Sequence, residues 1–297
     1  MGVNKISMWY LLLAIPFIPL LVLWFSIDVR QFLHKRRGVR SPIEGQKFLR
    51  GPGQYLREQL WHWLTKFMGC VLGVVCMASI SSANIINAIQ SEPLQLARIA
   101  LAAGLPLVTS VVFVFLSIRY FGVAQRYRRG LEGEIAVSQE LNQFIARGCF
   151  VFHDIPEKSI GNIDHVIVAD TGVFAIETKA ISKMTSGSRS AAVECDGVRI
   201  RFPSGRESSQ PIIQAQRGAA WLRRALSDAL ASDIPVRAIV CLPGWFVENE
   251  GSQRGEVRVR NPKRIVNVIA NERNRLTTRQ MKQIERWLDA RCRTEEF

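Results

Sequence analysis

The sequence lacks the cysteine and histidine patterns of a protein stabilised by bound metals or disulfide bonds. It has four histidines and six widely separated cysteines, which are Cys70, Cys76, Cys149, Cys195, Cys241 and Cys292. None of them forms a CxxC pair or a Cys/His spacing typical of zinc. These absences argue against a structural zinc site and a disulfide framework, and they favour unpaired thiols in a reducing compartment.

Acidic residues are scarce in the first part of the chain. Residues 1–129 hold 15 of the 39 Lys and Arg but only four of the 25 Asp and Glu, so their net charge is +11. The rest of the chain carries a net charge of +3. The total of +14 therefore does not describe a uniformly basic protein that coats nucleic acid.

Three long segments contain no charged residue at all. They are residues 8–27, 67–89 and 99–118, and each is close to the roughly 20 residues with which an α-helix crosses a bilayer core. We therefore predict three transmembrane helices. A cleaved signal peptide is the alternative for the first, but no Ala-x-Ala site follows it. The absence of ionisable groups inside the segments argues against a transporter or a proton relay.

The loops between these segments predict their orientation. Residues 28–66 contain nine Lys and Arg, the link at 90–98 contains only Glu92 and Arg98, and four arginines follow the third segment. Because cytoplasmic loops accumulate Lys and Arg, we expect the N-terminus outside and the C-terminal domain in the cytoplasm. This predicts an integral membrane protein, as in the bacterial inner membrane. The aromatic stretch 55–63 is typical of an interfacial anchor, and nucleic-acid contact is the alternative role.

From residue 130 onward the pattern changes to short elements, so we divide the chain into a membrane region, 1–129, and a second domain, 130–297. Apolar spacing predicts helices at 132–147, 211–230 and 276–291. Runs rich in β-branched residues predict strands at 149–153, 162–169, 173–179 and 236–242, with a further hairpin at 192–202. The predicted class is mixed α/β (α+β), preceded by an all-α transmembrane region.

The hairpin at 162–179 gathers charged residues on one face. A two-residue turn at either Asp170-Thr171 or Thr171-Gly172 places Asp164 opposite Glu177 or opposite Lys179. Side chains on a strand alternate, so Glu177 and Lys179 share a face and either register brings all three groups together. A three-residue loop without a bulge would separate them.

Two carboxylates beside a lysine match the needs of metal-assisted phosphodiester hydrolysis. Oxygen ligands hold Mg²⁺ or Mn²⁺, and an ammonium group can orient water or stabilise negative charge as it develops. The alternative for these residues is a cross-strand ion pair on the surface.

Four motifs occur in a set order around this hairpin. They are Gly130-x-x-Gly133-Glu134 at a helix, Asn162-Ile163-Asp164-His165, the run from Gly172 to Lys179, and Gln210-Pro211-x-x-Gln214. Residues 128–245 thereby resemble the NERD (nuclease-related) domain of the PD-(D/E)xK superfamily. The resemblance implies a restriction-endonuclease-like core of order α-β-β-β-α-β.

The same resemblance implies roles for particular residues. Asp164 and Glu177 would be metal ligands, Lys179 the catalytic lysine, and Glu134 the third acidic ligand. Its rival Glu132 points about 200° away on the helix, so only one of the two can face the site. Gln214 would contact the metal-bound water, the lysine or a substrate phosphate.

The sequence thus predicts a membrane-anchored, metal-dependent nuclease. Its cofactor would be Mg²⁺ or Mn²⁺, and its partners nucleic acid, with DNA favoured over RNA by the resemblance, and membrane lipid. The alternative is a membrane-anchored binding or scaffold module that keeps the fold without turnover. His165 is expected on the opposite sheet face as a packed residue, and Asn162 is expected to hold the loop before its strand.

Overall fold

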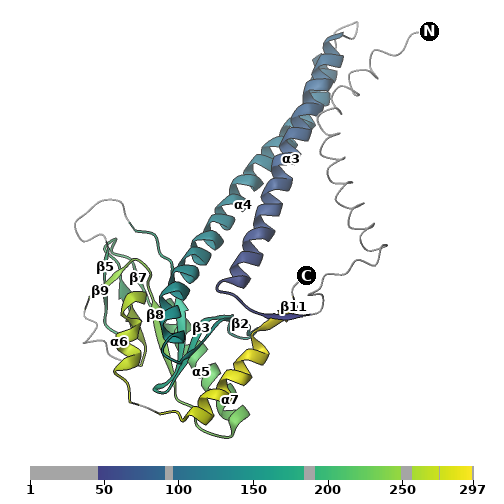
Figure 1. The fold of residues 1–297 in the computed structure, drawn as a ribbon. Helices are drawn as coiled ribbons and strands as arrows, with labels where there is room; N and C mark the ends of the chain where they lie inside the picture. Colours follow the sequence, from purple (N-terminus) through teal and green to yellow (C-terminus); the bar gives the residue numbers. More distant parts are fainter. Residues whose placement is uncertain (1–45, 91–95, 184–190, 249–255, 274, 296–297) are drawn as a thin grey trace. The chain divides into compact units, whose positions relative to one another are not determined.

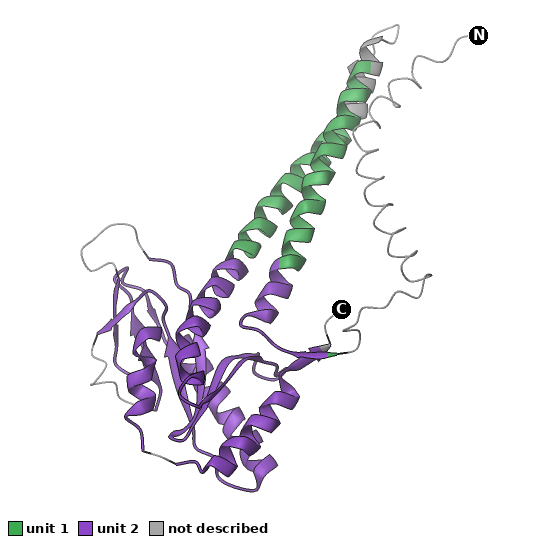
Figure 2. Cartoon of the chain, in the orientation of Figure 1, with its two compact units in different colours: residues 1–46, 61–125, 297 green, residues 47–60, 126–296 purple. Residues whose placement is uncertain are grey.

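The computed structural model describes residues 46–90, 96–183, 191–248, 256–273 and 275–295. The chain divides into two compact units (Figure 2). Among the described residues, the first unit holds the parts of two long helices that lie within 61–125, and the second holds residues 47–60 and 126–296. The first predicted transmembrane segment, 8–27, lies outside the described residues.

The first unit consists of apolar stretches of α3 (Gln54–Gln90) and α4 (Leu96–Ile145). Both helices are long and apolar enough to cross a membrane. They pack against each other through Trp63 with Tyr120 and Phe67 with Phe121, whose ring centroids lie 5.6 and 5.4 Å apart. Large apolar side chains such as Leu105 and Ile118 are about 70% exposed, at 72% and 69%. An apolar surface of this kind is typical of helices that face lipid or a partner.

Helix α4 is longer than the sequence pattern predicts. The predicted third transmembrane segment and the helix predicted at 132–147 form one element of 50 residues, which tolerates Pro106 inside. No residue between them adopts a left-handed conformation that would end the helix. The helix ends at Ile145, three residues before Gly148, whose φ of +80° suits a chain reversal.

The second unit is built around a five-stranded sheet of order β10-β8-β4-β3-β2, which confirms the mixed α/β class (Figure 1). Its strands are β2 (Phe150–Ile155), β3 (Ile163–Ala169), β4 (Gly172–Thr178), β8 (Val236–Cys241) and β10 (Arg258–Arg260). The first three pair antiparallel, whereas β4, β8 and β10 run parallel. A second sheet has four strands: β5 (Ala192–Cys195), β6 (Ile200–Arg201), β7 (Glu207–Ser208) and β9 (Phe246–Glu248). In the sequence, its first three strands lie between β4 and α5, and β9 lies between β8 and β10.

Helices cover both faces of the five-stranded sheet. On one face α5 (Gln210–Leu230) and α7 (Thr278–Arg291) pack with Val166, Val173 and Ala175 in one apolar core. On the other face α4 and α6 (Ile265–Ala270), which follows the short 3-10 helix η2 (Pro262–Arg264), pack with Ile167 and Phe174. Because neighbouring strand residues point to opposite faces, nearly every side chain of β3 and β4 is buried.

The ends of the second unit meet in a two-stranded sheet. Strand β1 (Lys47–Leu49), which precedes α3, pairs antiparallel with β11 (Arg293–Glu295), which follows α7. The pairing joins segments about 245 residues apart, as the pair Leu49 and Arg293 shows. Residues 47–60 therefore fold with the mixed α/β unit.

Candidate active site

The five residues singled out in the sequence line one cavity of about 400 Å³ in the second unit. They come from four elements and the segment after one of them: Glu134 from α4, Asp164 from β3, Glu177 from β4, Lys179 just after β4, and Gln214 from α5. Since β3 and β4 are antiparallel, the start of β3 and the end of β4 lie together. The cavity forms at this end of the hairpin.

The turn of the hairpin determines how its charged groups meet. Ala169 pairs with Gly172, so the turn consists of Asp170 and Thr171. The register extends to His165 opposite Ile176, and the next position along sets Asp164 opposite Glu177. The Oδ2 atom of Asp164 accepts a hydrogen bond of 2.6 Å from the backbone N–H of Thr178. The Nζ atom of Lys179 lies 2.7 Å from Oε1 of Glu177. These contacts hold two carboxylates and the lysine around one space.

Helix α4 presents Glu134, and not Glu132, to this cavity. Glu134 is only 6% exposed, whereas the side chain of Glu132 is 59% exposed and pairs with Arg128 at 2.9 Å. Gly133 explains the close approach of the helix to the strand end. A Cβ atom at Gly133 would lie 2.5 Å from the Cβ atom of Ala180, so no larger residue fits between helix and strand here.

Burial and neighbouring carboxylates raise the pKa of two acidic groups in the cavity. Burial raises the pKa of Glu134 to about 8, with further contributions from Asp154 and Glu177. Burial, followed by the charges of Glu177 and Glu134, raises the pKa of Asp164 well above its usual value. Burial lowers the pKa of Lys179, but the combined attraction of Glu177, Asp164 and Glu134 outweighs this and the pKa is raised overall. One ammonium group thus faces three crowded carboxylates.

The donor set of the cavity fits a hard divalent cation. Among the residues that the structure describes, no group of three or more His, Cys, Asp or Glu is arranged to hold a metal ion by itself. Mg²⁺ commonly takes one or two carboxylates and keeps several waters, which Asp164 and Glu177 can satisfy. The Oε2 atom of Glu134 is buried without a hydrogen-bond partner. A cation would relieve both this unsatisfied oxygen and the mutual repulsion of the carboxylates.

Basic residues lie beside the acidic cavity. Gln214 is exposed at the cavity, and a neighbouring hollow of about 310 Å³ shares Arg126 and Ala180 with it. Arg126, Arg129 and Arg206 line that hollow, and Nη1 of Arg129 donates to Oγ of Ser182 at 2.7 Å. Three arginines that line one hollow form a surface suited to phosphate groups.

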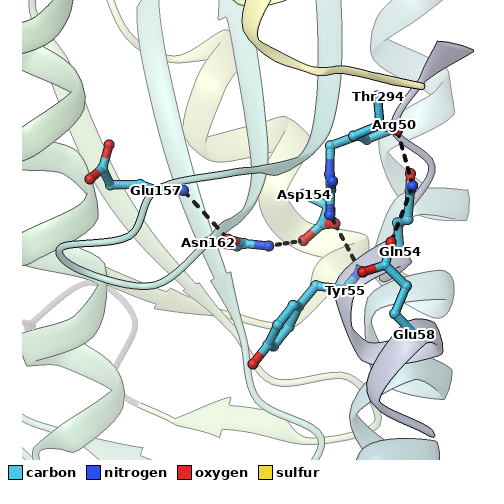
Figure 3. Close-up of polar contacts among 8 residues, drawn as sticks. All are labelled: Arg50, Gln54, Tyr55, Glu58, Asp154, Glu157, Asn162 and Thr294. Atoms are coloured by element: carbon cyan, nitrogen blue, oxygen red, sulfur yellow. Dashed lines mark hydrogen bonds and ion pairs between the residues drawn. The ribbon is translucent and has the colours of Figure 1, made fainter. Parts of the chain in front are cut away.

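The sequence patterns did not predict several residues that lie at or beside this cavity. Figure 3 shows the carboxylate of Asp154, which lines the cavity, in contact with Arg50, Tyr55 and Asn162. Arg50 belongs to the segment that the charge pattern assigned to a basic loop, and no spacing links it to residue 154. Tyr55 contributes to the cavity wall, whereas the sequence suggested an interfacial anchor. The positive φ of Asp154, +51°, has no sequence signature either.

The two residues with expected supporting roles lie as predicted. His165 is fully buried, with its Nδ1 atom 2.8 Å from Nδ1 of His153. Asn162 donates to Oδ1 of Asp154 at 2.8 Å and accepts from the backbone N–H of Glu157 at 3.4 Å, which ties down the loop before β3.

Comparison with known proteins gives one match. The family model described as "Nuclease-related domain" (NERD) matches residues 129–243, which contain all five predicted site residues. No curated protein and no solved structure matches the chain. The match supports a nuclease-related domain in this part of the sequence and an interaction with nucleic acid.

Proposed function

We propose that this chain is a membrane-anchored, metal-dependent nuclease of the PD-(D/E)xK type that hydrolyses phosphodiester bonds at the cytoplasmic face. The observation that carries the proposal is the convergence of Glu134, Asp164, Glu177 and Lys179 on one cavity, in which burial and crowding raise the pKa of Glu134 and Asp164. A surface ion pair would not bury an unpartnered carboxylate oxygen, since doing so costs free energy.

Each group in the cavity has a role in this reaction. Asp164 and Glu177 would hold Mg²⁺ or Mn²⁺, with Glu134 as the third acidic ligand. The bound cation would polarise the scissile phosphate and lower the pKa of a water molecule. The ammonium group of Lys179, kept charged by Glu177, donates hydrogen bonds to oxygens on which negative charge develops. The amide of Gln214 orients a substrate phosphate from α5.

The arginines beside the cavity provide the substrate contacts. Arg126, Arg129 and Arg206 hold phosphates that neighbour the cleaved bond, without reading base sequence. The preference for DNA over RNA is supported by the family resemblance alone. The membrane anchor is supported by the two apolar helices and their exposed side chains, and the orientation by the distribution of Lys and Arg.

The test is cleavage by the full chain in detergent, with DNA and RNA as substrates and with Mg²⁺, Mn²⁺ or a chelator present. We expect the chelator to abolish cleavage, and Asp164→Asn and Lys179→Met to lower it by about 10²-fold or more. Glu132→Gln is the matched control, because it neutralises a neighbouring glutamate that points away from the cavity.

Two outcomes would contradict the proposal. Equal cleavage by the wild type and both site variants would reveal a contaminating nuclease. Nucleic-acid binding without cleavage under any metal condition would favour the alternative, a binding module that keeps the fold without turnover.

A further inference from the structure

A segment outside the family match forms part of the cavity wall. Residues 47–55, here called the N-terminal segment, precede and begin α3, and Tyr55 of this segment lines the cavity with the carboxylates. The match begins at residue 129, so these residues belong to no part of the recognised domain. Their contacts show how they are held in place.

The first part of the segment is joined to the end of the chain's last described helix. Besides the pairing of β1 with β11, the backbone N–H of Arg50 donates to the carbonyl of Cys292 at 2.7 Å. The Nε2 atom of Gln54 donates to Oγ1 of Thr294 at 3.1 Å, and Nη1 of Arg293 donates to the carbonyl of Lys47 at 3.0 Å. Several independent contacts therefore fix the path of the segment.

A buried ion pair fixes the middle of the segment. Arg50 and Asp154 are 8% and 3% exposed, and two guanidinium nitrogens of Arg50 donate to Oδ2 of Asp154, Nε at 3.0 Å. The same oxygen accepts from the backbone N–H of Tyr55 at 2.9 Å (Figure 3). Asp154 thus clamps the chain on both sides of Gly53, at Arg50 and at Tyr55.

Between these two clamps, Gly53 reaches Glu134. The backbone N–H of Gly53 lies close enough to the Glu134 carboxylate to lower its pKa, against the larger effect of burial. Gly53 has a φ of +66°, which favours glycine. A Cβ atom there would collide with the Leu131 side chain and lie 3.5 Å from Oε2 of Glu134.

We infer that the N-terminal segment positions Glu134 for metal binding. Arg50 and Asp154 hold Gly53, and the amide of Gly53 orients the Glu134 carboxylate toward Asp164 and Glu177. Arg50, Gly53 and Asp154 are therefore positioning residues for the site, supplied mainly from outside the domain that the family match covers. The metal-binding part of the inference rests on the proposed function, but the contact between Gly53 and Glu134 does not.

The first experiment reads that contact directly in the full chain, by hydrogen exchange of peptides that cover residues 47–56 without metal or substrate. We expect Glu134→Ala to speed exchange of the Gly53 amide and to leave the β1 amides at 47–49 unchanged. Glu134→Gln, which keeps an acceptor oxygen, should restore part of the protection. Unchanged exchange at Gly53 in Glu134→Ala would overturn the inference, whether or not the protein cleaves anything.

The second experiment measures Mn²⁺ binding by the full chain. Gly53→Ala and Arg50→Lys, which keeps the charge but loses the guanidinium fork, should each weaken Mn²⁺ binding by about tenfold, the lower range for partners that orient metal ligands. Arg223→Lys is the matched control, because Arg223 forms a comparable pair with Asp233 on the surface. Wild-type affinity in both variants, with only a lower melting temperature, would reduce the segment to a structural role and overturn the inference. Mn²⁺ binding that depends on the segment, in a protein that cleaves no nucleic acid, would refute the proposed function and uphold this inference.

Discussion

The second unit contains two neighbouring acidic sites, Asp154 and the carboxylates of the cavity. They differ in how many hydrogen-bond and ion-pair partners their oxygens have. Asp154 accepts hydrogen bonds from a guanidinium group, a side-chain amide and a backbone N–H, so both of its oxygens have partners. Glu134, Asp164 and Glu177 share the single ammonium group of Lys179, and one oxygen of Glu134 has no partner. A carboxylate with hydrogen-bond partners for both oxygens stabilises the fold. A crowded carboxylate with an unpartnered oxygen is instead suited to bind a cation.

The largest expected effect comes from breaking the satisfied group. Asp154→Leu leaves the Arg50 charge buried without a partner, which should cost about 3–5 kcal/mol in the free energy of unfolding. The double variant Arg50→Met/Asp154→Leu removes both charges and should recover at least half of that loss. Chemical unfolding followed by tryptophan fluorescence measures both. Equal loss in the single and double variants would show that the ion pair is not the source of the effect.

Removing the charge of Glu134 should have the opposite effect and raise the free energy of unfolding. The folded-state pKa of Glu134 is about 8, above its usual 4.5, so the folded state keeps a proton that the unfolded state loses. Its contribution is present below pH 4.5 and is lost as the pH rises through 8, at about 1.4 kcal/mol per pH unit between these two values.

The variant Glu134→Gln tests this directly. Without metal, it should unfold at a higher temperature than the wild type at pH 8.5, with the difference shrinking toward pH 5. Adding Mg²⁺ should stabilise the wild type but not the variant. A wild-type melting temperature that does not fall from pH 5 to pH 8.5 relative to the variant would contradict the assigned charge imbalance.

The histidine pair beneath the site should give a smaller effect at acidic pH. Burial lowers the pKa of His153 from its usual 6.5 to about 4. A lowered pKa contributes stability above pH 6.5 that is lost as the pH falls toward 4, about 2 kcal/mol at pH 5. His153→Gln keeps a hydrogen-bonding group without this titration, so its melting temperature should fall less than that of the wild type between pH 7.5 and pH 5. Parallel curves would argue against the assignment.

The smallest effect belongs to Glu132, the exposed neighbour of Glu134. Its i,i+4 pair with Arg128 is solvated on both sides, and such pairs contribute about 0.5 kcal/mol or less. Glu132→Gln should therefore leave the melting temperature within about 1 °C and leave cleavage unchanged. A large loss of cleavage would mean that Glu132 takes part in the reaction despite its exposed position.

The sequence predicted much of the hairpin that carries the site, because its determinants are local. The alternation of side chains in β3 and β4 and the turn at Asp170 and Thr171 set the register that brings Asp164 to Glu177. On the helix, local geometry predicted that only one of Glu132 and Glu134 can face the site, and the family resemblance favoured Glu134.

The parts that the sequence did not predict depend on contacts between distant segments. Arg50 and Asp154 lie 104 residues apart, and β1 and β11 lie at opposite ends of the described chain. Nothing in the sequence around Arg50 indicates that it pairs with Asp154, so by sequence Arg50 is only one of nine basic residues in a loop. Strands of two or three residues such as β6, β7 and β10 are likewise too short to show an alternating pattern.

Gly133 has an evolutionary consequence. Its missing side chain lets α4 lie against Ala180 at the end of β4, and so sets Glu134 beside the hairpin carboxylates. A lineage could exchange many surface residues of α4 without moving the site, but replacing this one hydrogen atom by a methyl group would push the helix away from the strand. We therefore expect glycine at this position to persist in descendants that keep a working site, and to drift in those that keep only the fold.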